Sequence, residues 1–96
     1  MNIRFTKFKS REQWVEGIVN DGEYSFIAKL FDEGSKYGIN NGRVSSLSIS
    51  IGSTWSGFNN CVVNYERHWD IRPSKEYEDL FKFVLNFLEN APKTRF

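Results

Sequence analysis

The sequence predicts an α+β domain in which an antiparallel meander of four to five strands is covered on one face by a single C-terminal helix. Three observations lead to this fold. Apolar and polar residues alternate with a period of two up to Asp70, as in half-buried strands. Between Tyr77 and Leu88 the apolar residues recur with the 3.6-residue period of a helix. The connections between the expected strands are of hairpin length, which favours antiparallel neighbours.

The first strands are expected before residue 33. Ile3–Phe8 is a candidate short strand that would be the fifth of the sheet, and Trp14–Val19 is rich in β-forming residues. Asp21-Gly22 then supplies a tight hairpin turn before Glu23–Asp32. That last segment carries apolar residues on both faces, so we expect it in the centre of the sheet or against a partner.

Two further strands are expected between the loops. Arg43–Ile51 alternates leucine and isoleucine with serine, which predicts a sheet with one face in solvent. Cys61–Asp70 is expected as one continuous strand. Loops at Glu33–Gly42 and Gly52–Asn60 are rich in Gly, Ser and Asn, residues that favour turns.

The C-terminal segment has the features of a helix over residues 74–90. Ser74 is a suitable N-cap, and Pro92 ends the helix near Asn90. Phe83 and Phe87 widen its apolar stripe to nearly half the circumference. The stripe is expected to cover the apolar face of the sheet.

Composition indicates one domain over residues 1–96, made of a basic arm or edge strand (1–12), the sheet (13–70), the helix (74–90) and a tail (91–96). One cysteine excludes an internal disulfide and favours a reducing compartment. No apolar run approaches the ~20 residues that span a membrane, and the first residues lack the apolar run of a signal peptide. A net charge of +1 argues against an acidic DNA mimic and a strongly basic phosphate binder.

Three short motifs stand out along the chain: Trp14-x-x-Gly17, Tyr37-Gly38-Ile39-x-x-Gly42-Arg43-Val44-Ser45 and Tyr65-x-Arg67-x-Trp69-Asp70. As a set, over about residues 13–90, they resemble a small uncharacterised domain of phages and low-GC Gram-positive bacteria. In that pattern a basic residue often occurs where this chain has Ser46, and glycine where it has His68, so the resemblance gives His68 no family role. The resemblance implies a phage-derived protein in the cytoplasm of a bacterial host. It implies no established activity.

Candidate catalytic groups are few. Glu66, His68 and Asp70 alternate on one expected strand face and could hold a metal or relay a proton, although three ligands on one strand rarely converge. Cys61 and His68 fall on opposite faces by parity, which separates a nucleophile from its base. A solvated face and a small buried cysteine are the preferred interpretations. We therefore predict no catalytic residue, metal site or cofactor, and keep an enzyme built on the first three residues as the third hypothesis.

The favoured function is that of a small non-enzymatic interaction module that binds a protein partner. Trp55 and Phe58 lie in a Gly/Ser loop, where exposed aromatic residues are typical anchors of binding surfaces, or where they fold back to cap the core. Tyr37 is a third loop candidate, and Arg43 after the glycine-rich loop is a polar anchor that keeps anion binding open. A host-directed or counter-defence inhibitor would be one form of this function.

The alternative function is nucleic-acid binding through the N-terminal arm. Aromatic residues that stack on bases and cations that follow phosphates suit single-stranded nucleic acid. An edge strand whose charges discourage aggregation is the competing interpretation. The six residues of this alternative are Arg4, Phe5, Lys7, Phe8, Lys9 and Arg11.

Self-association as a two-fold homodimer is also expected. The apolar residues exceed what one sheet and one helix easily bury, and exposed apolar patches usually mark interfaces. The competing account is that the N-terminal arm or the Trp55 loop covers this surface within one chain. The expected interface residues are Ile27, Phe31, Phe83 and Phe87.

Overall fold

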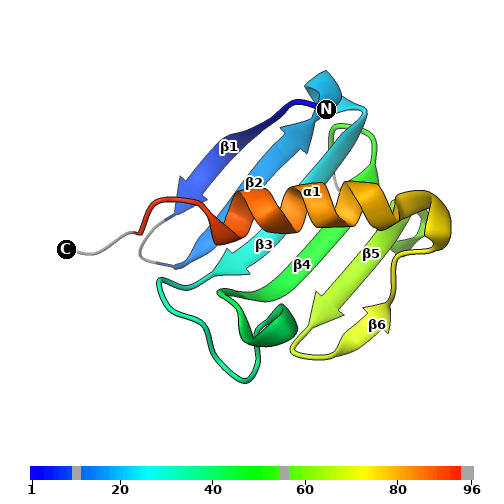
Figure 1. Ribbon diagram of the computed structural model, residues 1–96. Helices are drawn as coiled ribbons and strands as arrows, with labels where there is room; N and C mark the ends of the chain where they lie inside the picture. The colour runs from blue at the N-terminus through cyan, green and yellow to red at the C-terminus, as the bar shows by residue number, and fades with distance from the viewer. Residues whose placement is uncertain (10–11, 55–56, 94–96) are drawn as a thin grey trace.

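The computed structural model describes residues 1–9, 12–54 and 57–93, with the side chains of Lys9 and Phe58 also outside the description. Within these residues one antiparallel sheet contains six strands in chain order, and helix α1 (Glu78–Glu89) lies across one face (Figure 1). No helix in these ranges is long and apolar enough to cross a membrane. The strands are β1 (Ile3–Lys9), β2 (Trp14–Val19), β3 (Tyr24–Leu30), β4 (Val44–Ile51), β5 (Cys61–Glu66) and β6 (Trp69–Ile71).

The α+β class, the antiparallel sheet and the single C-terminal helix are confirmed, but the predicted number of four to five strands is wrong. The segment expected as one strand over residues 61–70 is a hairpin of β5 and β6. Arg67 turns the chain with φ of 62°, and the Glu66 amide donates to the His68 carbonyl at 3.0 Å. The turn residues Arg67 and His68 are neither glycine nor asparagine, and arginine rarely has a positive φ. The sequence therefore gives no signal for a turn here.

The helix begins later than expected. A short 3₁₀ turn, Lys75–Tyr77, precedes α1, which ends at Glu89. The Ser74 side chain makes no capping hydrogen bond, although its carbonyl accepts from the Tyr77 amide at 2.9 Å. The expected N-cap residue therefore starts the 3₁₀ turn and not the α-helix.

The core lies between α1 and the sheet. Leu80, Val84 and Leu88 are buried at helical spacing along the inner side of α1. The sheet meets them with alternate residues of its central strands, among them Val15, Phe26, Leu47, Ile49 and Val63. The apolar face of the predicted alternation in β4 is therefore the face that the helix covers.

The opposite face of the sheet carries the serines of β4. The Ser46 hydroxyl donates to Oε2 of Glu66 at 2.7 Å, and the Ser48 hydroxyl donates to Oδ1 of Asn64 at 2.6 Å. These cross-strand bonds tie β4 to β5 on the side away from α1. The prediction that this face lies in solvent is wrong for part of it, because Ser46 and Ser50 of β4 are buried there.

Candidate functional site

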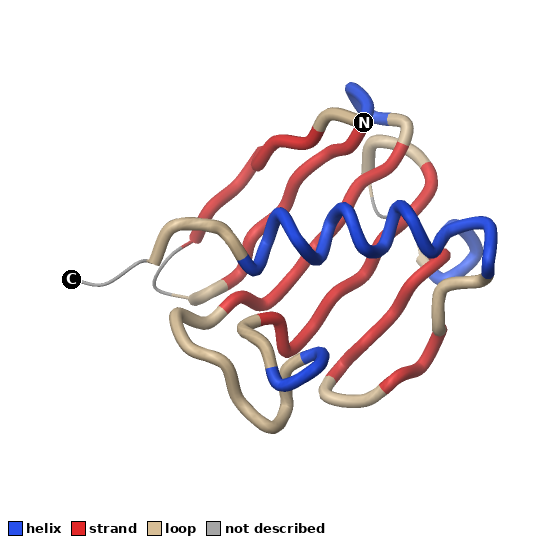
Figure 2. The backbone as a smooth tube through the Cα atoms, in the orientation of Figure 1, coloured by secondary structure: helices blue, strands red, loops and turns tan. Residues whose placement is uncertain are grey.

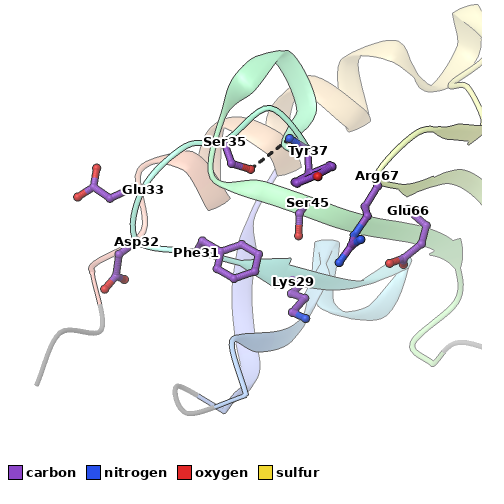
Figure 3. Close-up of a pocket in the computed structure, with 9 residues that line it drawn as sticks. All are labelled: Lys29, Phe31, Asp32, Glu33, Ser35, Tyr37, Ser45, Glu66 and Arg67. Carbon is purple, nitrogen blue, oxygen red and sulfur yellow. Dashed lines mark hydrogen bonds between the residues drawn. The ribbon is translucent and has the colours of Figure 1, made fainter.

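A pocket of about 380 Å³ opens at the end of the sheet where β3 ends and β4 begins (Figure 3). It is bounded by the long loop between those strands and by the β5–β6 turn, which lie side by side at that end in Figure 2. Its volume is near the lower end of the range for small-ligand sites, about 300–1,000 Å³. The residues that give it chemistry are Lys29, Phe31, Tyr37, Ser45, Glu66 and Arg67.

The β3–β4 loop is compact because its glycines pack against one another. The Ser35 amide donates to the Gly42 carbonyl at 3.2 Å, and the Gly38 amide donates to the Ser35 carbonyl at 3.1 Å. A Cβ atom on Gly38 would collide with the Gly42 carbonyl oxygen. The glycines of this loop therefore allow close backbone packing, which presents Tyr37 beside the pocket.

Tyr37 links this loop to the β5–β6 hairpin. Its carbonyl accepts a hydrogen bond from the Tyr65 hydroxyl at 2.9 Å. Its ring, in a residue 46 % exposed, has the Arg67 guanidinium carbon 5.1 Å from its centroid and Lys36 Nζ at 5.2 Å. The Arg67 amide in turn donates to the Ser45 carbonyl at 3.0 Å. Two motifs far apart in the sequence thus meet at one site.

Two cationic side chains line the pocket over aromatic rings. Lys29 Nζ lies 5.8 Å from the Trp14 ring centroid and 5.6 Å from that of Phe31, while Arg67 lies over Tyr37. With the described part of the chain, neither cation forms a side-chain hydrogen bond or ion pair. Such cations are attracted by the ring faces and keep their N–H donors for other partners.

Acidic side chains also border the pocket. Glu66 is held by the Ser46 hydroxyl, and Glu33 is paired with Lys93 Nζ at 2.9 Å. Figure 3 shows Asp32 and Glu33 directed away from the space between Phe31 and Tyr37, where the Ser45 hydroxyl lies. The positive groups therefore lie at one end of the cavity and the two outer acids at the other.

Arg43, predicted as a polar contact residue, is engaged within its own chain. Its Nε donates to the Phe31 carbonyl at 2.8 Å, and its Nη1 donates to the carbonyls of Glu89 and Ala91 at 2.9 and 2.6 Å. These carbonyls include those left unpaired at the C-terminus of α1. The guanidinium is thus a cap for the helix and not part of the pocket.

Of the other predicted contact residues, Tyr37 lines the pocket, Trp55 lies outside the described residues, and so does the side chain of Phe58. Phe31 was expected in a dimer interface and forms a pocket wall. Sequence reasoning missed Lys29, Ser45 and Arg67 as site residues, and it considered Glu66 only as a candidate for metal binding or proton transfer. Ser45 and Arg67 do belong to the second and third motifs, and the joint occurrence of those motifs was the available signal.

The N-terminal arm separates its rings from its cations. Phe5 packs on the helix side, with its ring centroid 4.8 Å from that of Phe87 and 6.2 Å from that of Phe26. Arg4 and Lys7 pair with the β2 residues whose side chains point to the other face. Phe8 stays on the helix side against Phe5, while Arg11 and the Lys9 side chain lie outside the described residues. The described arm therefore offers no mixed surface of rings and cations.

The four expected dimer residues do not share one surface. Ile27 is half-buried on the face away from α1, and Phe31 lines the pocket. Phe83 and Phe87 border a separate groove of about 370 Å³ between α1 and β1. The contact between Phe5 and Phe87 supports the competing account, in which the N-terminal arm covers the helix within one chain.

The residues considered as catalytic candidates, Glu66, His68, Asp70 and Cys61, do not all contact one another. His68, whose side chain is 74 % exposed, lies with Nε2 3.1 Å from Oδ1 of Asp70, whereas Glu66 bonds to Ser46. The described residues contain no group of three His, Cys, Asp or Glu placed to hold a metal. The Cys61 thiol donates to the Val63 carbonyl at 3.0 Å, and burial raises its pKa. The geometry thus gives these groups no common reaction centre.

Comparison with protein families matches residues 13–89 to a domain of unknown function (DUF7678). No curated protein and no solved structure matches the chain. The matched range runs from the residue before β2 to the end of α1, so it includes the residues that line the pocket and the pair Arg43 and Glu89. The expectation of an uncharacterised domain is confirmed, and the chain belongs to the DUF7678 family.

Proposed function

We propose that this protein is a non-catalytic interaction module that binds a protein partner at the pocket of Phe31, Tyr37 and Arg67. The observation that supports it is the convergence of two aromatic rings and two cations from separate segments on one cavity. Tyr and Arg are enriched at the centres of protein interfaces, where they anchor a partner in a pocket. The rigid sheet end supplies the positioning that such an anchor needs.

The partner class is a protein of the bacterial host. The support for this is the resemblance of the three motifs to a phage domain, together with a composition that favours a reducing compartment. A host-directed or counter-defence inhibitor acting in the cytoplasm is the form of the function that we propose. Such an inhibitor acts by occupying its target, which requires a binding surface and no chemistry.

Affinity capture from a host lysate tests the proposal. The wild-type chain and Arg72→Gln should retain one stoichiometric partner, whereas Tyr37→Ala should lose it. Arg72 is the matched control because it also lies over an aromatic ring, with its guanidinium carbon 5.3 Å from the Trp69 centroid, outside the pocket. Tyr37→Ala keeps the main-chain carbonyl that Tyr65 binds. A partner that both variants retain equally would show that the pocket is not the interface.

A further inference from the structure

We infer that the pocket binds the C-terminal residue of its partner, with the free carboxylate at Lys29 and Arg67 and a large apolar or aromatic side chain between Phe31 and Tyr37. The inference rests on the proposed function and names the chemistry of the ligand. It follows from three properties of the pocket: the arrangement of its cations, its net charge and the shape of its apolar part.

The two cations define the position of an anion. Figure 3 shows Lys29 from β3 and Arg67 from the β5–β6 turn reaching toward the same end of the pocket. The guanidinium carbon of Arg67 lies 5.1 Å from the Tyr37 centroid and its N–H groups have no acceptor among the described residues, so the edge of the guanidinium is left to donate. A planar carboxylate accepts two parallel N–H bonds from such an edge, and Lys29 adds a second positive charge.

The net charge favours a carboxylate over a phosphate. Glu66 lines the same end of the pocket, so the three groups Lys29, Glu66 and Arg67 sum to one positive charge. Asp32 and Glu33 border the other end, where Glu33 is paired with Lys93. One carboxylate would neutralise this single positive charge, whereas a phosphate close to two negative charges would leave an excess of negative charge beside Glu66 and Asp32. The surroundings therefore select a monoanion.

The remaining space is suited to one large side chain. Phe31 and Tyr37 stand on either side of the Ser45 hydroxyl in Figure 3. Within the described residues that hydroxyl has no hydrogen-bond partner, so it can bind a polar edge such as an indole N–H. A cavity of about 380 Å³ holds one residue and not an extended peptide. A free carboxylate next to a large side chain is what a protein presents at its C-terminus.

Titration of the full chain with paired small probes, followed by amide chemical shifts in nuclear magnetic resonance spectra, tests the inference. N-acetyl-L-tryptophan should shift the amides of Phe31, Tyr37, Ser45 and Arg67. N-acetyl-L-tryptophanamide, which lacks only the negative charge, should have a dissociation constant at least about tenfold larger. Arg67→Gln should remove this discrimination, and Arg72→Gln should preserve it. Lys29→Gln is the second variant if Arg67→Gln does not fold.

Other outcomes would overturn the inference. Equal affinities for N-acetyl-L-tryptophan and its amide would mean that Lys29 and Arg67 do not recognise a carboxylate. That result would leave the pocket as a binding site for a partner. Tighter binding of adenosine 5′-monophosphate would assign a nucleotide, and tighter binding of N-acetyl-aspartate methylamide would assign an internal acidic side chain. No shift at the pocket with any probe, in a chain that still captures its partner through Tyr37, would reject the ligand class and leave the proposed function standing.

Discussion

Arg43 and Glu89 are joined by two sets of hydrogen bonds, in which the side chain of each residue binds the main chain of the other. The Arg43 guanidinium donates to the Glu89 carbonyl at 2.9 Å, while Oε1 and Oε2 of Glu89 accept from the Arg43 amide at 3.0 and 2.9 Å. Oε2 also accepts from the Val44 amide at 3.3 Å. This clamp joins the start of β4 to the end of α1, two segments that are 46 residues apart. It fixes one end of the loop that builds the pocket.

Arg43→Ala should lower the free energy of unfolding by about 3 kcal/mol, because several carbonyls lose a charged donor. Arg43→Lys should recover only part of this loss, since an ammonium cannot reproduce the planar fork. Urea unfolding of both variants and of Glu89→Ala measures the effect, with Arg72→Ala as the surface control expected within about 0.5 kcal/mol. If the double variant lost the sum of the two single losses, the reciprocal coupling would be refuted.

Gly42→Ala should destabilise the protein by about 2 kcal/mol. The added Cβ would collide with Oε2 of Glu89 and displace the carboxylate from the start of β4. Asn41→Gly is the control in the same loop, because Asn41 has a positive φ of 61° that glycine adopts without strain. Thermal unfolding checks the pair, and a Gly42→Ala chain as stable as wild type would show that Glu89 moves freely.

Phe87→Asp should destabilise the single chain and leave its association unchanged. Phe87 is half-buried and packs against Phe5 and Phe26 within the same chain, so losing these ring contacts and placing a carboxylate beside them would cost about 3 kcal/mol. Lys82→Asp on the exposed side of α1 is the control. Self-association itself stays a prediction, which light scattering decides against the monomer mass of 11.3 kDa. If the wild type were a dimer and the Phe87→Asp variant were a monomer of unchanged stability, Phe87 would belong to a dimer interface.

The Cys61 thiol should react slowly with iodoacetamide in the folded protein. Burial raises its pKa above the ordinary value of 9.0, and the thiolate is the reactive form. Burial, then the charge of Glu23, likewise raises the pKa of Tyr24 above 10.0. Both groups are held neutral by folding, so their contribution to stability is present below these ordinary values and is lost as pH rises through the raised ones.

Alkylation rates in folded and urea-unfolded protein check this prediction, together with unfolding curves from pH 7 to 11. Cys61→Ala and Tyr24→Phe should each reduce the loss of stability at alkaline pH. A folded thiol that reacts as fast as the unfolded one would contradict the argument.

A short labelled single-stranded oligonucleotide should not bind at low salt through the N-terminal arm. Arg4 and Lys7 lie on the opposite face from Phe5 and Phe8, so base stacking and phosphate contacts cannot be made together. Gel shifts at increasing salt provide the measurement. Binding that weakens with salt and disappears in a variant with Arg4→Gln and Lys7→Gln would reinstate the nucleic-acid function.

The sequence by itself determined the fold class, the order of the main elements and the covered face of the sheet. These properties follow from local periodicity: serine alternates with leucine and isoleucine in β4, and Leu80, Val84 and Leu88 recur at helical spacing. Residue types that favour turns were likewise sufficient to place the loop before β4. Each of these signals is carried by neighbouring residues, so no knowledge of distant contacts is needed to use it.

The tertiary structure decided where the hairpin of β5 and β6 turns and what the polar residues bind. The left-handed conformation of Arg67 is held by the Ser45 carbonyl, a contact between residues 22 positions apart that no local pattern encodes. The same holds for Arg43, which is a helix cap only because α1 ends beside β4. The pocket exists because the sheet brings the ends of three segments together. Its chemistry therefore depends on long-range packing, whereas the elements that support it depend on local periodicity.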